Sequence, residues 1–360
     1  GMAVCWGNNV YWQATPPAIE FVQVRVGAFH GCGLDPVGEI HCWGEDQYGQ
    51  ASPPVGPFIQ LSVGYMTTCA LAVDQSVECW GYDSHGQAQA PQGTFDWVGA
   101  GTYHACGVRT DGSLECWGND QSGQATPPAG AFLEVAGGSM HSCGIRDDGS
   151  LECWGDDQYG QCTAPNFDSW ENVVTGEQQS CAIRTSDGTA VCWGQDQYGE
   201  SSPPVGDYLQ VDTAARHSCG VMTDGSMVCW GLNHDGACEP PDALPTPSGW
   251  LYDQVSTGGS YQNPGSCGLR DDGTVVCWGD DIYGQGSPPA TVFVEIAARV
   301  FYTSGLDTAG GLECRGDDQF AQPSPPGGIC TQVAAHPWAG RAVAFDQSLA
   351  RWANAQAAQA

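Results

Sequence analysis

Fourteen of the 19 cysteines stand in seven regular pairs, whose members are ten or eleven residues apart. Each pair flanks a turn such as Asp111-Gly112, and such a hairpin places the two cysteines opposite each other. The Cα atoms of a facing pair without hydrogen bonds are about 4.5 Å apart, which is within disulfide reach. We therefore predict seven disulfides and an oxidising compartment. The pairs are Cys32 and Cys42, Cys69 and Cys79, Cys106 and Cys116, Cys143 and Cys153, Cys181 and Cys192, Cys219 and Cys229, and Cys267 and Cys277.

A histidine precedes the first cysteine by two residues in four of these hairpins, so that both side chains share one strand face. These are His30, His104, His141 and His217. Metal binding is therefore one alternative to a disulfide, and seven reduced core cysteines are another. The other repeats hold Thr67, Gln179, Gly265 or Tyr302 at the histidine position. A metal ligand is not expected to be replaced so often, and this favours disulfides.

Five cysteines lack a regular partner, and an odd total leaves at least one thiol outside any intramolecular disulfide. They are Cys5, Cys162, Cys238, Cys314 and Cys330. Ser304 stands where the hairpin partner of Cys314 would be a cysteine, so we expect Cys314 to remain a thiol. A bond between Cys5 and Cys330 is one alternative for the closure of the fold, whereas the state of the others stays open.

Acidic, aromatic loops of the form Trp-Gly-x-Asp-x-Tyr-Gly recur along the chain. Their tyrosines are Tyr48, Tyr159, Tyr198 and Tyr283. We expect each Asp to accept hydrogen bonds from the loop backbone. The alternative is an acidic face that binds calcium or a basic protein, with the doublets Asp156-Asp157 and Asp280-Asp281 as metal candidates. A dedicated calcium loop groups several oxygen ligands, and no such pattern is present, so no cofactor is expected and calcium is the alternative.

These residues recur because the chain repeats with a period of about 37 residues. A fixed period of this size indicates one supersecondary unit stacked many times, hence a single domain over residues 1–360. The Cys-Trp-Gly motif or a decayed form of it begins at Cys5, Cys42, Cys79, Cys116, Cys153, Cys192, Cys229, Cys277, Cys314 and Arg351. The predicted repeats lie near residues 21–44, 58–81, 95–118, 132–155, 170–194, 208–231, 252–279, 293–316 and 330–353.

We predict that each repeat forms three or four short strands in a meander. Its segments of four to seven residues alternate between polar and apolar side chains and are bounded by Gly, Asp and Pro. An aromatic residue precedes an aliphatic one by three positions, as in Phe95 and Val98, and we expect both to pack between neighbouring sheets. The aromatic positions are Phe21, Phe58, Phe95, Phe132, Trp170, Tyr208, Tyr252 and Phe293.

Radial repetition of small sheets predicts an all-β fold, a single β-propeller. The pattern Val-x-x-Gly-x-x-His-x-Cys-Gly, Asp-Gly, Cys-Trp-Gly-x-Asp-x-Tyr-Gly-Gln resembles the repeats of the regulator of chromosome condensation family, and its compact bacterial branch in particular. The resemblance covers about residues 2–353 and implies a propeller that binds other macromolecules. Asp replaces the family's usual Asn after Trp-Gly, and the nuclear members lack the hairpin cysteines. Both departures argue against a role in chromatin.

We expect nine blades, with eight or ten as alternatives, and a ring closed by strands from both termini. The last repeat, 330–353, lacks the segment that follows Trp-Gly elsewhere. Residues 8–18 contain such a segment without a hairpin before it. We therefore predict that residues 8–18 complete the last blade. Such closure removes the exposed edges of an open sheet.

The charge excludes several partner classes. The chain has 41 acidic and 10 basic residues, a net charge of −31. Phosphate backbones and anionic lipids require clustered basic residues, so nucleic acid is not an expected partner. No stretch reaches 18 consecutive apolar residues, so no membrane span is expected.

The seventh repeat carries about 11 extra residues, and insertions in repeat proteins map to surface loops. Trp250, Tyr252 and Tyr261 in it are candidate partner-binding residues, together with the four loop tyrosines, since interfaces favour Trp and Tyr. No catalytic motif is present. We expect a non-enzymatic, monomeric, protein-binding scaffold that is extracellular, on the cell surface or periplasmic. The alternatives are a module that binds cations or glycans, and a hydrolase with its site in the central channel.

Overall fold

The structure is a computed structural model that describes residues 3–7, 9–17, 19, 21–166, 169–240, 251–259, 264–298, 302–307 and 315–316. The first strands of the repeats are β2 (Gln23–Val26), β5 (Phe58–Val63), β8 (Phe95–Ala100), β11 (Phe132–Gly137), β14 (Trp170–Thr175), β17 (Tyr208–Thr213), β20 (Tyr252–Gly259) and β23 (Phe293–Ala298). The second strands are β3 (His30–Leu34), β6 (Thr67–Ala72), β9 (His104–Arg109), β12 (His141–Arg146), β15 (Gln179–Arg184), β18 (His217–Met222), β21 (Pro264–Arg270) and β24 (Tyr302–Asp307). The third strands are β4 (Ile40–Gly44), β7 (Val77–Gly81), β10 (Leu114–Gly118), β13 (Leu151–Gly155), β16 (Ala190–Gly194), β19 (Met227–Gly231) and β22 (Val275–Gly279). The remaining elements are β1 (Ala3–Gly7), β25 (Arg315–Gly316) and a 3-10 turn at His234–Gly236.

Each complete repeat forms an antiparallel meander of three strands, such as β8, β9 and β10. The register places Cys106 opposite Cys116, as the hairpin spacing predicts. The seven complete repeats have no fourth strand where the structure describes them, because the segment after Trp-Gly forms turns that lead into proline. Proline lacks the N–H group that a ladder requires.

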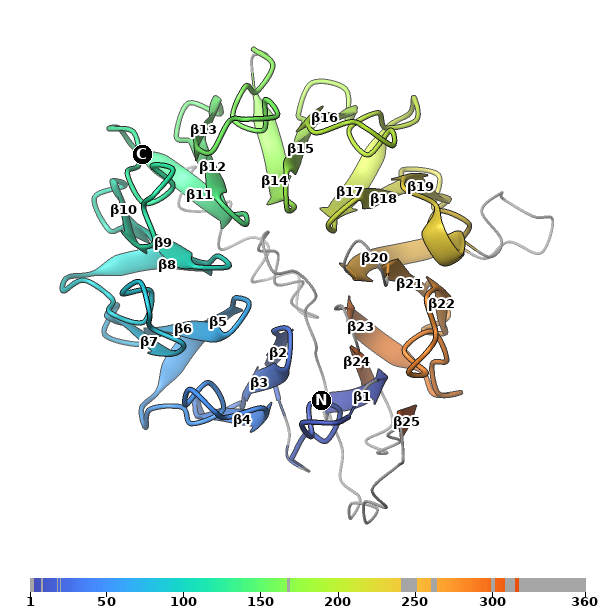
Figure 1. Cartoon of the computed structure of the whole chain (residues 1–360), viewed down its shortest axis with the longest axis horizontal. Helices are drawn as coiled ribbons and strands as arrows, with labels where there is room; N and C mark the ends of the chain where they lie inside the picture. The colour runs from blue at the N-terminus through green and yellow to red at the C-terminus, as the bar shows by residue number, and fades with distance from the viewer. Residues whose placement is uncertain are drawn as a thin grey trace.

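The sheets are arranged as the blades of a propeller, with the first strand of each repeat nearest the centre (Figure 1). Neighbouring sheets share a hydrophobic core, and the predicted aromatic residues lie in these cores. Phe95 and Val98 of the third sheet, for example, pack against Leu71 and Val77 of the second. The aromatic positions are buried in the eight described repeats, as predicted from their periodicity.

Two glycines in the repeat allow these contacts. A Cβ atom at Gly107 would lie 2.6 Å from the ring of Phe95, and one at Gly101 would lie 2.7 Å from the ring of His104. Such distances are shorter than van der Waals contact, so a side chain at either position would displace a buried ring. The motif therefore contains glycine at these positions because two rings occupy the space.

The eighth sheet combines the N-terminal strand with the repeat at 293–316, in the order β23-β24-β1-β25. Strand β1 takes the place of a third strand, with Cys5 opposite Ser304. Strand β25 pairs in parallel with the outer side of β1. A shared core also joins this sheet to the first one: Leu306 and Cys5 cluster with Phe21 and Val24.

This arrangement differs from the predicted closure. We predicted a strand within residues 8–18, whereas the strand that pairs is Ala3–Gly7, and residues 9–17 form turns where the structure describes them. The physical reason is that Ala3–Gly7 holds the Cys-Trp-Gly motif, and turn residues follow it as they do in the first seven repeats. The structure describes eight sheets, and the predicted ninth repeat, 330–353, lies outside the described residues. Nine blades therefore stay a prediction.

Within the described ranges, no helix has the length and apolar character needed to span a membrane.

Candidate functional site

The propeller has two faces, because successive connections in an antiparallel meander alternate between its ends. One face is formed by the turns between first and second strands and by the loops after the third strands, and we refer to it as the loop face. For the first three repeats these are residues 27–29, 64–66 and 101–103, and residues 45–52, 82–89 and 119–126. Hydrogen bonds join the two kinds of segment: the backbone N–H of Glu45 donates to the Phe29 carbonyl over 2.9 Å. The hairpin face, on the opposite side, contains the turns between second and third strands, such as residues 147–150.

The seven predicted cysteine pairs lie at disulfide distance. Their S–S distances are 2.02–2.09 Å and their Cα atoms are 4.0–4.1 Å apart. Each bond joins the second and third strands of one sheet, so it braces a single blade. Burial raises the pKa of Cys162 and of Cys238 to about 12, and nearby carboxylates act in the same direction. These two side chains are therefore protonated, unreactive thiols at neutral pH. Cys314 and Cys330 lie outside the described residues.

The four histidines before the cysteines connect neighbouring blades. His104 Nε2 lies 2.7 Å from Oγ of Ser142, and His141 Nε2 lies 2.8 Å from Oγ of Ser180. Oγ of Ser142 also lies 3.3 Å from the Gln124 carbonyl, so this hydroxyl links His104 to the loop of the third repeat. His30 and His217 make the same contact with Thr68 and Ser266. Because their cysteines form disulfides, these histidines have a structural place between blades, not a metal-binding one.

A tryptophan clamp fixes each loop on the loop face. The indole of Trp80 donates to the Gln50 carbonyl over 3.2 Å, and that of Trp117 to the Gln87 carbonyl over 3.0 Å. The tryptophan thus belongs to one blade and the loop to the blade before it. The same contact recurs at Trp43, Trp154, Trp193, Trp230 and Trp278. The loops therefore display their tips from a rigid frame.

The predicted metal candidates accept hydrogen bonds within their own loops. The Asp157 carboxylate accepts from the backbone N–H of Cys162 over 2.7 Å and from the Thr163 hydroxyl over 3.0 Å. Asp156 accepts from the Gln161 amide over 2.8 Å. Asp280 and Asp281 have the corresponding partners, and Asp280 is buried. For Asp157 and Asp281 this is the turn role that we expected, whereas Asp156 and Asp280 accept from a glutamine side chain of the same loop.

One group of ligand-type side chains converges among the described residues, namely Asp35, Glu39 and His41 on the hairpin face. One oxygen of Asp35 accepts from the backbone N–H groups of Val37 and Glu39, and the other lies 3.1 Å from His41 Nε2. The Asp35 carboxylate is therefore already engaged in closing its own hairpin turn.

The predicted partner-binding residues have different environments. Tyr48 and Tyr159 are 44% and 41% exposed on the loop face, whereas Tyr198 and Tyr283 are half-buried. The prediction for Tyr252 was wrong. Its ring is buried in the core between the sixth and seventh sheets, because it fills the aromatic position of its repeat. Trp250 and Tyr261 lie outside the described residues.

The structure adds aromatic residues that the sequence analysis missed. On the loop face Tyr11 contacts Phe29 edge to face, with ring centroids 5.6 Å apart, and Phe29 contacts Tyr65 in the same way at 6.2 Å. Tyr48 similarly contacts Tyr82 at 4.9 Å. These contacts lie on the eighth, first and second sheets. A signal was present in the sequence, since the turn between the first and second strands holds Phe29, Tyr65 or Tyr103 in the first three repeats and no aromatic residue in the next three.

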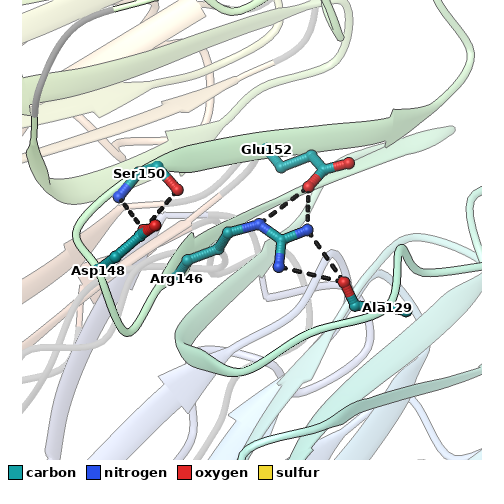
Figure 2. A network of polar contacts seen from close by, with 5 residues as sticks. All are labelled: Ala129, Arg146, Asp148, Ser150 and Glu152. Carbon is teal, nitrogen blue, oxygen red and sulfur yellow. Dashed lines mark hydrogen bonds and ion pairs between the residues drawn. The ribbon is translucent and has the colours of Figure 1, made fainter.

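The hairpin face is built differently, and Figure 2 shows one of its networks. The Arg146 guanidinium pairs with Glu152 and donates to the Ala129 carbonyl over 3.2 Å. It also lies over the ring of Phe132, 4.5 Å from the centroid. In the adjacent turn, Asp148 accepts from the backbone and hydroxyl of Ser150. The charged groups of this turn are thus held by their own blade.

The family model for the Regulator of chromosome condensation (RCC1) repeat matches five segments of the chain. They are residues 21–50, 98–124, 132–161, 210–237 and 253–285. Each segment contains a hairpin or part of one and extends to the loop after it, so the matches follow the structural repeat. None of the curated proteins compared matches the chain.

Solved structures share the fold. The CRINKLY WD40 ectodomain of the Arabidopsis thaliana receptor kinase ACR4 is 27% identical, with a TM-score of 0.50, over 61% of this chain and 82% of that one. The ectodomain of the Physcomitrella patens receptor kinase CR4 is 23% identical, with a TM-score of 0.55, over 72% and 73%. Yeast RCC1 (Prp20) bound to Kap60 is 14% identical, with a TM-score of 0.57, over 84% and 88%. The resemblance to an RCC1-like β-propeller is thus confirmed, whereas the bacterial branch stays a prediction.

Proposed function

We propose that this chain, which carries RCC1 repeats, is a non-enzymatic propeller that binds a protein partner through its loop face. The observation that carries the proposal is the exposure of aromatic side chains, such as Tyr48 and Tyr159, on loops that tryptophan clamps hold rigid. Aromatic side chains presented on a rigid frame lose little conformational entropy on binding, and Trp and Tyr dominate the binding energy of many interfaces.

Two further features support this function. The loop carboxylates accept hydrogen bonds from their own turns, which suits display and not proton transfer. Yeast RCC1 (Prp20), which has the same fold, was solved bound to a protein, Kap60. We propose that this chain uses the scaffold in the same general way, with a different partner.

We place the protein outside the cell, on the cell surface or in the periplasm. Seven disulfides within one chain support an oxidising compartment, since cytosolic thiols are kept reduced. The ectodomain of the ACR4 receptor kinase, which is 27% identical, is a further example of this architecture in a receptor's extracellular part.

Site-specific photo-crosslinking tests the proposal. A photoreactive phenylalanine is placed at Tyr159 on the loop face and, as the matched control, at the fully exposed Val205 on the hairpin face. The oxidised protein is then illuminated with the extracellular fraction of its source. We expect one protein to be crosslinked from Tyr159 and to be displaced by excess unlabelled chain. Crosslinks from Val205 alone, displacement by oligosaccharides, or hydrolysis of a chromogenic glycoside would each overturn the proposal.

A further inference from the structure

The N-terminal loop has the same frame as the other loops of the loop face. In the first repeat the backbone N–H of Gly49 donates to the Asp46 carbonyl over 3.1 Å, and that of Tyr48 donates to the Gln50 side chain over 2.8 Å. The segment 9–15 repeats these contacts. Trp12 N–H donates to the Asn9 carbonyl over 3.1 Å, and Tyr11 N–H donates to the Gln13 side chain over 2.8 Å.

Trp12 therefore occupies a position that is glycine in the other loops. The glycines have φ angles between 78° and 85°, in the left-handed region. They are Gly49, Gly86, Gly123, Gly160, Gly199, Gly236 and Gly284. Trp12 adopts φ 68° in the same turn. A residue with a Cβ atom loses about 1 kcal/mol or more in this conformation, and strain of this kind persists mainly where function requires it.

The side chain of Trp12 does not fill a hydrophobic core. A Cβ atom built at Gly49, Gly86 or Gly123 meets no atom within 4 Å, so this position projects its side chain away from the protein. Trp12 is accordingly 53% exposed, the largest aromatic exposure among the described residues. A large apolar side chain that is held in solvent at a conformational cost indicates a contact with something outside the chain.

Trp12 stands beside the aromatic contacts of the loop face. Six aromatic residues gather on the eighth, first and second sheets, and we refer to them as the aromatic arc. They are Tyr11, Trp12, Phe29, Tyr48, Tyr65 and Tyr82. Tyr11 and Tyr65 are 45% and 36% exposed, so the arc presents ring surface to solvent. Tryptophan and tyrosine in such clusters are typical anchors of protein interfaces.

The charge around the arc selects the partner. The loops and turns that carry it, residues 9–15, 27–29, 45–52, 64–66 and 82–89, contain Glu45, Asp46 and Asp83 but no lysine or arginine. Cationic side chains bind to aromatic faces and are attracted by neighbouring carboxylates. On the hairpin face, by contrast, Arg109 and Arg146 lie over phenylalanine rings of their own blades.

We propose that the aromatic arc binds an arginine- or lysine-rich segment of the protein partner, with Trp12 as its anchor. This inference rests on the proposed function and names the partner chemistry and the part of the loop face that recognises it. The strain of Trp12 is then the cost of presenting an anchor, and the net charge of −31 attracts the partner over a longer range.

Calorimetric titration with a synthetic peptide of alternating arginine and glycine tests the proposal, with the glutamate counterpart as the charge control. Three variants of the full chain are compared: Trp12→Gly, Val205→Ser and Gly160→Trp. We expect Trp12→Gly to weaken peptide binding at least tenfold, or by about 1.4 kcal/mol, and to leave the melting temperature unchanged or higher. Val205→Ser, at a fully exposed position on the hairpin face, is expected to bind within twofold of the parent, and Gly160→Trp to gain no affinity.

Equal binding of the arginine peptide by Trp12→Gly and the parent would overturn the proposal, because the attraction would then be general. A lower melting temperature of Trp12→Gly would also overturn it, since Trp12 would be a packing residue. If the peptide does not bind while crosslinking from Tyr159 still captures one displaceable protein, the arc inference fails and the proposed function stands. If both fail, the proposed function fails as well.

Discussion

Ser304 donates a hydrogen bond to Sγ of Cys5 over 3.0 Å, across the two strands that join the N-terminus to the eighth sheet. Cys5 and Ser304 have the same register as the cysteines of a hairpin disulfide, such as Cys106 and Cys116. The register therefore places serine where a hairpin has the second cysteine of its disulfide.

Ser304→Cys is expected to form this bond spontaneously under oxidising conditions. The bond would close a loop of 299 residues, and the chain-entropy account gives such long loops the largest effect, typically about 2–4 kcal/mol. Non-reducing peptide mapping would identify the crosslink between Cys5 and the introduced thiol, and denaturant unfolding would measure the gain. Ser304→Ala is the control; a Ser304→Cys chain that keeps its thiols would contradict the register of β1.

The buried histidines predict loss of stability in mild acid. Burial lowers the pKa of His104 to about 4 and that of His141 to about 3, the latter with help from the His104 charge. Both are neutral in the folded chain, whereas unfolded histidine binds a proton below about pH 6.5. The contribution of these histidines to the free energy of unfolding is therefore fully present above about pH 6.5. It is lost as the pH falls towards 4, by on the order of 3 kcal/mol per histidine at most.

The free energy of unfolding of His141→Gln, measured between about pH 7.5 and 4.5, checks this sign. Glutamine already stands at this position in the fifth sheet, where the Gln179 amide donates to the Ala214 carbonyl over 2.8 Å. We expect the variant to lose part of the pH dependence in this window. The turn carboxylates, such as Asp148, have lowered pKa values and contribute only below about pH 4. Identical slopes for parent and variant would refute the assignment.

Asp157 is expected to act as a turn cap and not as a calcium ligand. Asp157→Ala removes two acceptor contacts, and we expect a loss of about 1 kcal/mol, whereas Asp157→Asn keeps most of the stability. Asn233 fills the same loop position in the sixth repeat and accepts from the Cys238 N–H over 3.0 Å. Thermal melts with calcium and with a chelator should coincide. A calcium-dependent rise that Asp157→Asn abolishes would instead restore the metal alternative.

Gly265→Ala is expected to stabilise the seventh sheet. A Cβ atom at Gly265 would meet its nearest neighbour, the Trp278 carbonyl oxygen, at 3.7 Å, which is ordinary contact. Replacing glycine at such a position typically adds about 0.4–1 kcal/mol, because it restricts the unfolded chain. Gly268→Ala is the matched control in the same strand and should destabilise, since its Cβ atom would lie 2.7 Å from the Tyr252 ring. Chemical denaturation of the two variants decides the sign.

Local patterns were enough to predict the hairpins. The spacing of Cys106 and Cys116 around Asp111-Gly112 specifies a turn, a register and a facing pair, and all three depend on neighbouring residues only. The aromatic position represented by Phe95 followed from periodicity in the same way. Tyr252 was wrongly predicted as a surface anchor because it lies beside the insertion, although the same periodicity assigns it to an aromatic core position.

The closure and the roles of the histidines could not be predicted from one repeat. The motifs Cys5-Trp6-Gly7 and Cys314-Arg315-Gly316 are equally suited by sequence to the third position of the eighth sheet, and the structure places the first of them beside β24. The partner of His104 is Ser142, 38 residues away in the next blade. The sequence alone shows that Trp12 replaces the loop glycine, since Tyr-Trp-Gln stands in place of Tyr-Gly-Gln. The significance of this replacement depends on the backbone angle of Trp12, which only the structure gives.

The hairpin disulfides also determine how the ring responds to mechanical tension. Each bond spans ten or eleven residues of one blade and takes them out of the force-bearing path, so an unravelling blade lengthens by about 35 Å less than its sequence would allow. None of the seven bonds joins β1 to β24. Among the described residues, a pull on the N-terminus is resisted there by strand pairing and packing, and we expect β1 to separate from β24 before the braced blades unravel.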